Sequence, residues 1–111
     1  MTLHDIFSQC KELSVFEERS LTDNYYEIVY YTREMPRIEQ IFTGLFGIAA
    51  KPAGAKPSRE DAKLAEEFGG VWGNQTLYKK TYDTMTVIAM FWPWQDNTHL
   101  TVKMARIPQG V

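Results

Sequence analysis

Apolar and polar side chains alternate with a helical period at the start of the chain. The apolar positions that share one helical face are Leu3, Ile6, Phe7, Cys10, Leu13 and Phe16. This spacing is typical of an amphipathic helix. Thr2 and Asp5 add a start signal, because each side chain can accept a hydrogen bond from the backbone N–H of the other. We therefore predict a first helix from residue 3 to about residue 19.

Two more helices are predicted in the middle of the chain. Over residues 35–46 the apolar side chains recur at i, i+3, i+4, i+7 and i+8, and Gly47 is a natural stop. Residues 48–57 contain two Lys-Pro steps and a glycine, which favour an extended and exposed linker. Ser58 then caps a short helix that ends at Phe68.

Four other segments alternate with the period of two that strands require. Tyrosine, isoleucine and valine, which favour extended backbone, fill the first of them. The predicted strands cover residues 25–33, 75–82, 85–94 and 99–106. The last three are separated by Asp83-Thr84 and by a polar turn around Asp96-Asn97, as expected of an antiparallel meander with tight hairpins.

The order of these elements is α-β-α-α-β-β-β. It predicts one α+β domain over residues 1–111, with a four-stranded antiparallel sheet and the helices packed on one of its faces. A chain of 111 residues, of which 44% are hydrophobic, is long enough to bury a core of its own.

Alternation along the meander divides its side chains between two faces of the sheet. If each hairpin turns over two residues, one face is an ordinary apolar core. The opposite face has large apolar side chains on its middle strand and polar ones at its rim, which is typical of interfaces and ligand grooves. The candidate binding residues on that face are Met90, Trp92, Trp94, Lys79, His99, Thr101 and Lys103. Tyr31 joins them if its strand presents the same face.

Other interpretations of this face stay open. The middle strand is core if a curled sheet or the linker covers it, and a one-residue error in either turn would exchange the two faces. Pro93 cannot donate a ladder hydrogen bond, so it should end or bulge the strand. Trp94 would then either reach the rim of the sheet or pack on Pro93.

Charge and cysteine content narrow the class of protein. Twelve basic and fourteen acidic residues give a net charge of −2 without a basic stripe, which argues against a general affinity for nucleic acid or anionic membranes. The single cysteine, Cys10, excludes an internal disulfide and fits a reducing compartment. The N-terminus lacks a signal-peptide pattern, and the longest apolar run is too short for a membrane span. We expect a cytoplasmic protein of bacterial type.

Residues suited to catalysis or metal binding are few. His4, Cys10 and His99 lack the paired spacing of metal ligands, so we predict no metal site, and no cofactor motif is present. His99 could act as an acid or a base, but the sequence places no carboxylate or nucleophile to complete a dyad. Asp96 is expected only to shape its turn.

Basic residues gather at the start of the third predicted helix. Lys51, Lys56 and Arg59 surround a helix N-terminus, where free backbone N–H groups attract anions. The GxxxxGK[ST] pattern of a phosphate-binding loop is absent. The segment is therefore a candidate anion site or, alternatively, a solvated and charge-balanced loop.

The leading functional hypothesis is a non-enzymatic binding or interaction module. Its contact surface would centre on Met90 and Trp92, with a homodimer as one form of assembly, since both side chains offer large apolar area. The alternative is a small enzyme or small-molecule-binding protein with a pocket between sheet and helices near Trp94 and His99. Nucleic-acid binding by stacking on Trp92 and Trp94 is a third class, which the acidic charge balance disfavours.

Overall fold

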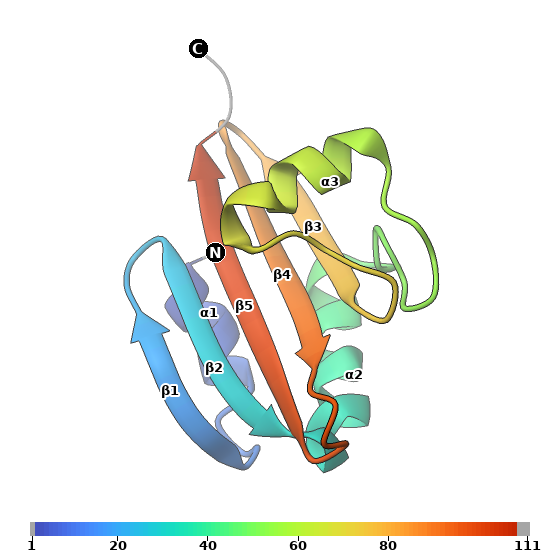
Figure 1. Cartoon of the computed structure of the whole chain (residues 1–111). Helices are drawn as coiled ribbons and strands as arrows, with labels where there is room; N and C mark the ends of the chain where they lie inside the picture. Colours follow the sequence, from blue (N-terminus) through green and yellow to red (C-terminus); the bar gives the residue numbers. More distant parts are fainter. Residues whose placement is uncertain (1, 109–111) are drawn as a thin grey trace.

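A five-stranded antiparallel sheet forms the centre of the molecule in the computed structural model, which describes residues 2–108 (Figure 1). The strands lie in the order β1-β2-β5-β4-β3. Their bounds are β1 (Val15–Leu21), β2 (Tyr25–Tyr31), β3 (Thr76–Tyr82), β4 (Met85–Pro93) and β5 (His99–Pro108). The predicted α+β class and antiparallel sheet are confirmed, but the sheet has five strands rather than four.

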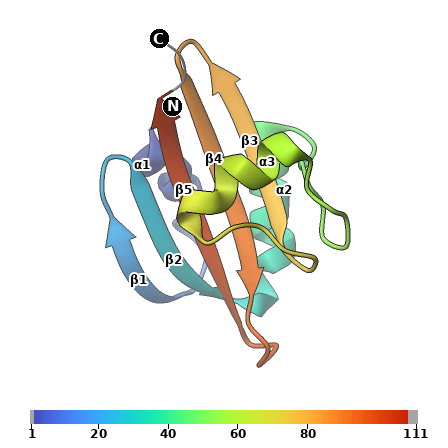
Figure 2. The same ribbon diagram turned by 45° about the horizontal axis from the view of Figure 1, so that its top comes forward.

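Helices cover both faces of the sheet, not one face as predicted. In Figure 1, α1 (Leu3–Gln9) and α2 (Met35–Phe46) lie behind the sheet and α3 (Arg59–Ala65) lies in front of it; Figure 2 agrees. We call these sides the α1–α2 face and the α3 face. The 3-10 turns η1 (Thr32–Glu34) and η2 (Glu66–Phe68) precede α2 and follow α3. None of the helices among residues 2–108 is long and apolar enough to span a membrane.

The linker explains how α3 reaches the second face. Lys51 and Leu77 exchange backbone hydrogen bonds of 3.1 and 2.9 Å, which attach the linker to the outer edge of β3. The chain therefore leaves α2 on one side, passes the sheet edge and returns on the other side. Prediction of helices on a single face failed because the path of a linker is not encoded in the periodicity of the helices it joins.

The first predicted helix is wrong beyond residue 9. The chain turns after α1, and Val15–Leu21 forms β1 instead. The Ser14 N–H donates to a carboxylate oxygen of Glu34 at 2.6 Å, which ties this turn to η1. As a strand, the segment pairs with backbone groups of β2 that would otherwise lie at an open sheet edge. That ladder outweighs the helical spacing of Leu13 and Phe16.

Other local signals act as predicted. Thr2 and Asp5 form a reciprocal capping box at α1, and the Ser58 side chain accepts a hydrogen bond from the Asp61 N–H at the start of α3. The register of both hairpins is confirmed, with Tyr82 opposite Met85 and the Trp94 N–H donating to the His99 carbonyl at 2.9 Å. The faces derived for the meander are therefore correct.

The main core lies between the sheet and the helices α1 and α2. It contains the predicted core side chains of the meander, namely Tyr78, Val87, Ala89, Phe91, Leu100, Val102 and Met104, with Tyr82 at its margin. Phe42 of α2 packs against Phe91 and Tyr78, with ring centroids 5.3 and 6.0 Å apart. Cys10 is buried here as well, and burial raises the pKa of its thiol to about 11.

Candidate functional site

α3 and the loop that follows it divide the α3 face into a covered half and an open half. The covered half is a second apolar cluster formed by Ala65, Val71, Leu77, Ile88, Met90 and Ala105. Met90 has no exposed surface (0%), so it is core in this structure and not the centre of a contact surface. A helix that was predicted to lie on the other face thus buries the middle of the predicted contact surface.

Trp92 and Lys103 mark the border of the covered half. The Lys103 ammonium lies 3.4 Å from the centroid of the half-buried Trp92 ring and donates to the Phe68 carbonyl at 3.0 Å. Burial lowers the pKa of the Lys103 amine, and the nearby Glu27 carboxylate opposes that effect. Lys103 therefore binds Trp92 and the end of η2, which belongs to the segment that covers this half of the face, and is not directed to a partner.

Two other predicted lysines also hold α3 and the loop that follows it in place over the sheet. Lys79 of β3 donates to the Asp61 carboxylate at 2.6 Å, close to the start of α3. Lys51 is only 1% exposed, and burial lowers the pKa of its amine. Its ammonium donates to the backbone carbonyls of Trp72, Gly73 and Gln75.

The predicted anion site does not come together. Lys51 is directed to carbonyl oxygens, whereas Lys56 and Arg59 lie at the surface. Lys56 instead borders a groove of about 630 Å³ between the linker, α3 and the loop of residues 69–73, where Trp72 is exposed. That loop and its tryptophan were absent from the predicted site.

The open half of the α3 face carries a group of aromatic side chains that we call the aromatic patch: Phe16, Tyr31, Trp94 and His99. The Phe16 ring centroid lies 4.3 Å from His99, 5.9 Å from Tyr31 and 6.3 Å from Trp94. Trp94 and His99 are 4.7 Å apart, as expected from their opposed positions at the β4–β5 hairpin. Phe16 is 47% exposed although it is large and apolar. The patch thus combines three predicted residues with one from the missed strand.

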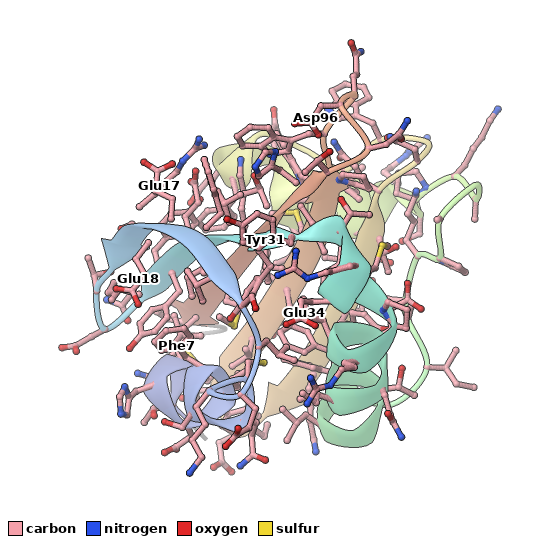
Figure 3. The ribbon with its side chains drawn as sticks, turned by 90° about the horizontal axis from the view of Figure 1, so that it is seen from below. Phe7, Glu17, Glu18, Tyr31, Glu34 and Asp96 are labelled. Atoms are coloured by element: carbon pink, nitrogen blue, oxygen red, sulfur yellow. The ribbon has the colours of Figure 1, made fainter. Side chains whose placement is uncertain are left out.

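Two irregularities interrupt the pairing of β1 with β2, one between Val15 and Glu17 and one between Glu18 and Ser20, and the first of them positions Phe16. Val15 pairs with Tyr30 and Glu17 with Val29, so the strand contains an extra residue at Phe16, as in a β-bulge. A bulge places two neighbouring side chains on one side of the sheet, and here Phe16 and Glu17 both lie on the α3 face. Figure 3 shows Glu17 and Tyr31 on this side of the sheet, and Phe7 with α1 on the other.

His99 has a carboxylate partner that was not expected from the sequence. Its Nδ1 lies 2.6 Å from Asp96 Oδ2, and the other oxygen of Asp96 accepts hydrogen bonds from the backbone N–H groups of Thr98 and His99. These hydrogen bonds, that of the His99 ring first, lower the pKa of the Asp96 carboxyl. Asp96 therefore both shapes the turn, as predicted, and orients the imidazole. The Trp94 indole N–H donates to the Thr101 hydroxyl at 2.7 Å, which fixes the second ring.

Charged side chains of both signs surround the patch. The Arg19 guanidinium lies 5.4 Å from the Trp94 ring centroid, and the Arg33 guanidinium lies 4.6 Å from that of Tyr31. Arg19 also pairs with Glu17 at 2.9 Å and with Glu27 at 3.5 Å. An apolar centre with a charged rim can bury aromatic surface against a partner while its rim remains solvated.

Phe16, Arg19 and Asp96 were not predicted as site residues, and the contact of Asp96 with the predicted residue His99 was not expected either. The first two were assigned to a helix, and only the valine and phenylalanine after Ser14 hinted at extended structure. The three-residue spacing of Asp96 and His99 across a turn was visible in the sequence. Their contact depends on the turn conformation, which includes a positive φ of 58° at Asn97.

The described residues contain no group of three or more histidine, cysteine, aspartate or glutamate side chains that could hold a metal ion. The chemistry that the patch supports is aromatic contact and hydrogen bonding by one oriented imidazole. Comparisons with protein-family models, curated proteins and solved structures find no match for this chain.

Proposed function

We propose that this chain is a non-enzymatic protein-interaction module that binds its partner through the aromatic patch. The observation that carries the proposal is the exposure of Phe16, a large aromatic side chain that is 47% accessible and packed edge-on against Tyr31 and Trp94. Aromatic residues and arginine are enriched where protein interfaces gain most of their binding energy. The patch presents both, with Arg19 and Arg33 at its rim.

The openness of the patch favours a protein over a small molecule. Small-molecule sites are usually concave and enclose most of their ligand. The larger grooves lie elsewhere, one beside α3 and one between α3 and the strands β3 and β4. An open aromatic surface with charges of both signs at its rim fits a flat or convex protein surface better.

Replacing Trp94 by alanine should weaken partner binding by about thirtyfold or more, because truncating a central interface tryptophan commonly costs about 2 kcal/mol or more. The matched control is Trp72→Ala, which removes an exposed tryptophan from the loop beside the other groove. The measurement is native mass spectrometry of the chain purified gently from its own cells, followed by titration of the co-purified protein against each variant.

The two tryptophan variants give opposite expectations. Retained binding by Trp72→Ala and lost binding by Trp94→Ala, with both variants folded by circular dichroism, would support the patch. Loss of binding in Trp72→Ala alone would move the function to the groove beside α3. Equal binding by both variants would contradict a role for the patch.

The Asp96–His99 pair favours acid–base catalysis as a second candidate function. A histidine that is oriented through Nδ1 by a carboxylate is a common arrangement in enzymes that transfer protons. His99→Gln separates the two candidates, since the amide retains hydrogen bonding but transfers no proton. Because His99 is one of the four rings of the patch and the other three remain, an interaction module should lose only about fivefold in partner affinity, about 1 kcal/mol. A much larger loss would show that the imidazole itself is required.

A further inference from the structure

The edge strand β1 carries an unusual share of the exposed apolar surface. Val15, Phe16 and Leu21 are 36%, 47% and 46% exposed, and the other exposed large apolar residues among residues 2–108 lie in the linker and the glycine-rich loop. Within the part of the chain that the structure describes, β1 pairs with β2 alone, at one end of the sheet (Figure 1). An edge strand presents unpaired backbone groups that another strand can bind.

We propose that β1 pairs antiparallel with β1 of a second copy of this chain, about a two-fold axis at Glu18. The sequence of β1, VFEERSL, is complementary to itself in that register. Val15 lies across from the second copy's Leu21, and Glu17 lies across from its Arg19. By symmetry each contact forms twice, so the dimer gains two apolar pairs and two oppositely charged pairs.

The faces of the side chains support the same axis. Val15, Glu18 and Leu21 are paired with Tyr30, Ile28 and Tyr26, so they lie on the α1–α2 face. Phe16, Glu17, Arg19 and Ser20 lie on the α3 face, where Phe16 contacts Trp94 and Arg19 bonds Glu17. The assignment of side chains to the two faces is therefore symmetric about Glu18. Opposed residues therefore share a face, and the bulge at Phe16 meets the irregularity at Arg19 of the second copy.

Other antiparallel registers lose this match. An axis between Glu17 and Glu18 sets two carboxylates opposite each other, and these lie on different faces of the sheet. An axis between Glu18 and Arg19 opposes Glu18 to Arg19 and Phe16 to Leu21, and in both of these pairs the two residues again lie on different faces. An axis at Glu17 sets Val15 against Arg19, and an axis at Arg19 sets Glu17 against Leu21. Only the axis at Glu18 joins apolar with apolar and acid with base between residues that lie on the same face of the sheet.

The small size of the proposed interface sets the affinity that we expect for the dimer. One seven-residue strand buries little area, so we expect a dissociation constant of roughly 1–100 µM, in the range of small transient interfaces. The two Glu18 side chains meet at the axis and repel each other. Glu18→Gln should therefore tighten the dimer by about two- to fivefold.

Sedimentation equilibrium of the purified chain between about 1 and 300 µM, a range that brackets the affinity expected of a small interface, tests the dimer. Wild type should show a concentration-dependent monomer–dimer equilibrium. Arg19→Glu and Glu17→Arg should each weaken it about tenfold or more, because each places like charges across both halves of the interface. The double variant Glu17→Arg/Arg19→Glu exchanges the charges and should restore it. Glu39→Arg and Arg59→Glu, on exposed helix positions, control for net charge and should dimerise like wild type.

Mixing the two single variants gives the most specific result. The Glu17→Arg chain carries two basic side chains at positions 17 and 19, and the Arg19→Glu chain carries two acidic side chains at the same positions. The mixture should therefore form a heterodimer although each variant alone is monomeric, and that rescue also shows that both variants fold. Wild type that stays monomeric at the highest concentration, or single variants with unchanged dimerisation, would overturn the proposal. The measurement contains no partner protein, so its outcome is independent of the proposed function of the patch.

Discussion

Replacing Lys51 by methionine should lower the free energy of unfolding by about 3–5 kcal/mol, a loss typical of removing one member of a buried polar cluster. Methionine fills a similar volume but donates no hydrogen bond, so the carbonyls of Trp72, Gly73 and Gln75 lose the ammonium that they share. Those carbonyls belong to the loop that leads from η2 into β3. Urea unfolding followed by circular dichroism measures the difference.

Lys56→Met is the matched control for this loss. Lys56 lies in the same linker, five residues later, but its side chain is exposed. Its substitution should change stability by less than about 0.5 kcal/mol, as surface substitutions usually do. Similar stabilities for the two variants would mean that the Lys51 ammonium does not hold the linker and the loop together.

Replacing Gly69 by alanine should also be strongly destabilising, by about 2–4 kcal/mol, since strain at a positive φ alone costs about 1–3 kcal/mol. Gly69 has a φ of 98°, a conformation that L side chains rarely adopt. A Cβ at this position would lie 2.4 Å from Cη2 of Trp92 and 3.2 Å from Nζ of Lys103. The ring and the ammonium would both have to move. Chemical denaturation of the variant gives the free energy directly.

Gly44→Ala is the corresponding control and should act in the opposite direction. Gly44 lies within α2, where an added Cβ meets no atom within 4 Å. Alanine favours helix over glycine, so stability should rise by up to about 1 kcal/mol. If Gly69→Ala were as stable as Gly44→Ala, the close packing of the loop on Trp92 would not exist in solution.

Lys51→Met and Gly69→Ala both act on α3 and the loop that follows it, the segment that covers half of the α3 face. Lys51 anchors the loop before β3, and Gly69 packs the end of η2 on Trp92. If α3 and this loop loosen, Met90 and Leu77 become accessible on the predicted binding face of the sheet. The difference between a contact surface and a second core thus depends on one short helix and the loop that follows it.

Much of the fold follows from local pattern. The helix over residues 35–46, the short helix after Ser58 and the three strands of the meander lie where periodicity places them. The hairpin register is also predictable, because turn residues such as Asp83 and Asn97 accept positive φ and side chains alternate strictly on either side of them. Each of these features depends on interactions between residues close in the chain.

The candidate site was only partly predictable. Trp94, His99 and Thr101 were assigned to the correct face of the sheet from alternation alone. Tyr31 was included only on the condition that its strand presents the same face, and the structure brings all four residues together. Phe16 and Arg19 were missed, because the helical spacing of Leu13 and Phe16 is genuine and only the ladder with β2 overrides it. A one-dimensional pattern contains no information on which distant strand offers that ladder.

The sequence by itself determined the fold class, most of the elements, the register of the meander and the side chains of each of its faces. Local propensity and alternation carry that information, since they act over a few residues. Only the tertiary structure decided that residues 15–21 form a strand and that α3 covers Met90. It also decided that Lys51 binds carbonyls rather than anions. These outcomes depend on contacts between segments far apart in the chain, where burial and the pairing of backbone polar groups outweigh local preference.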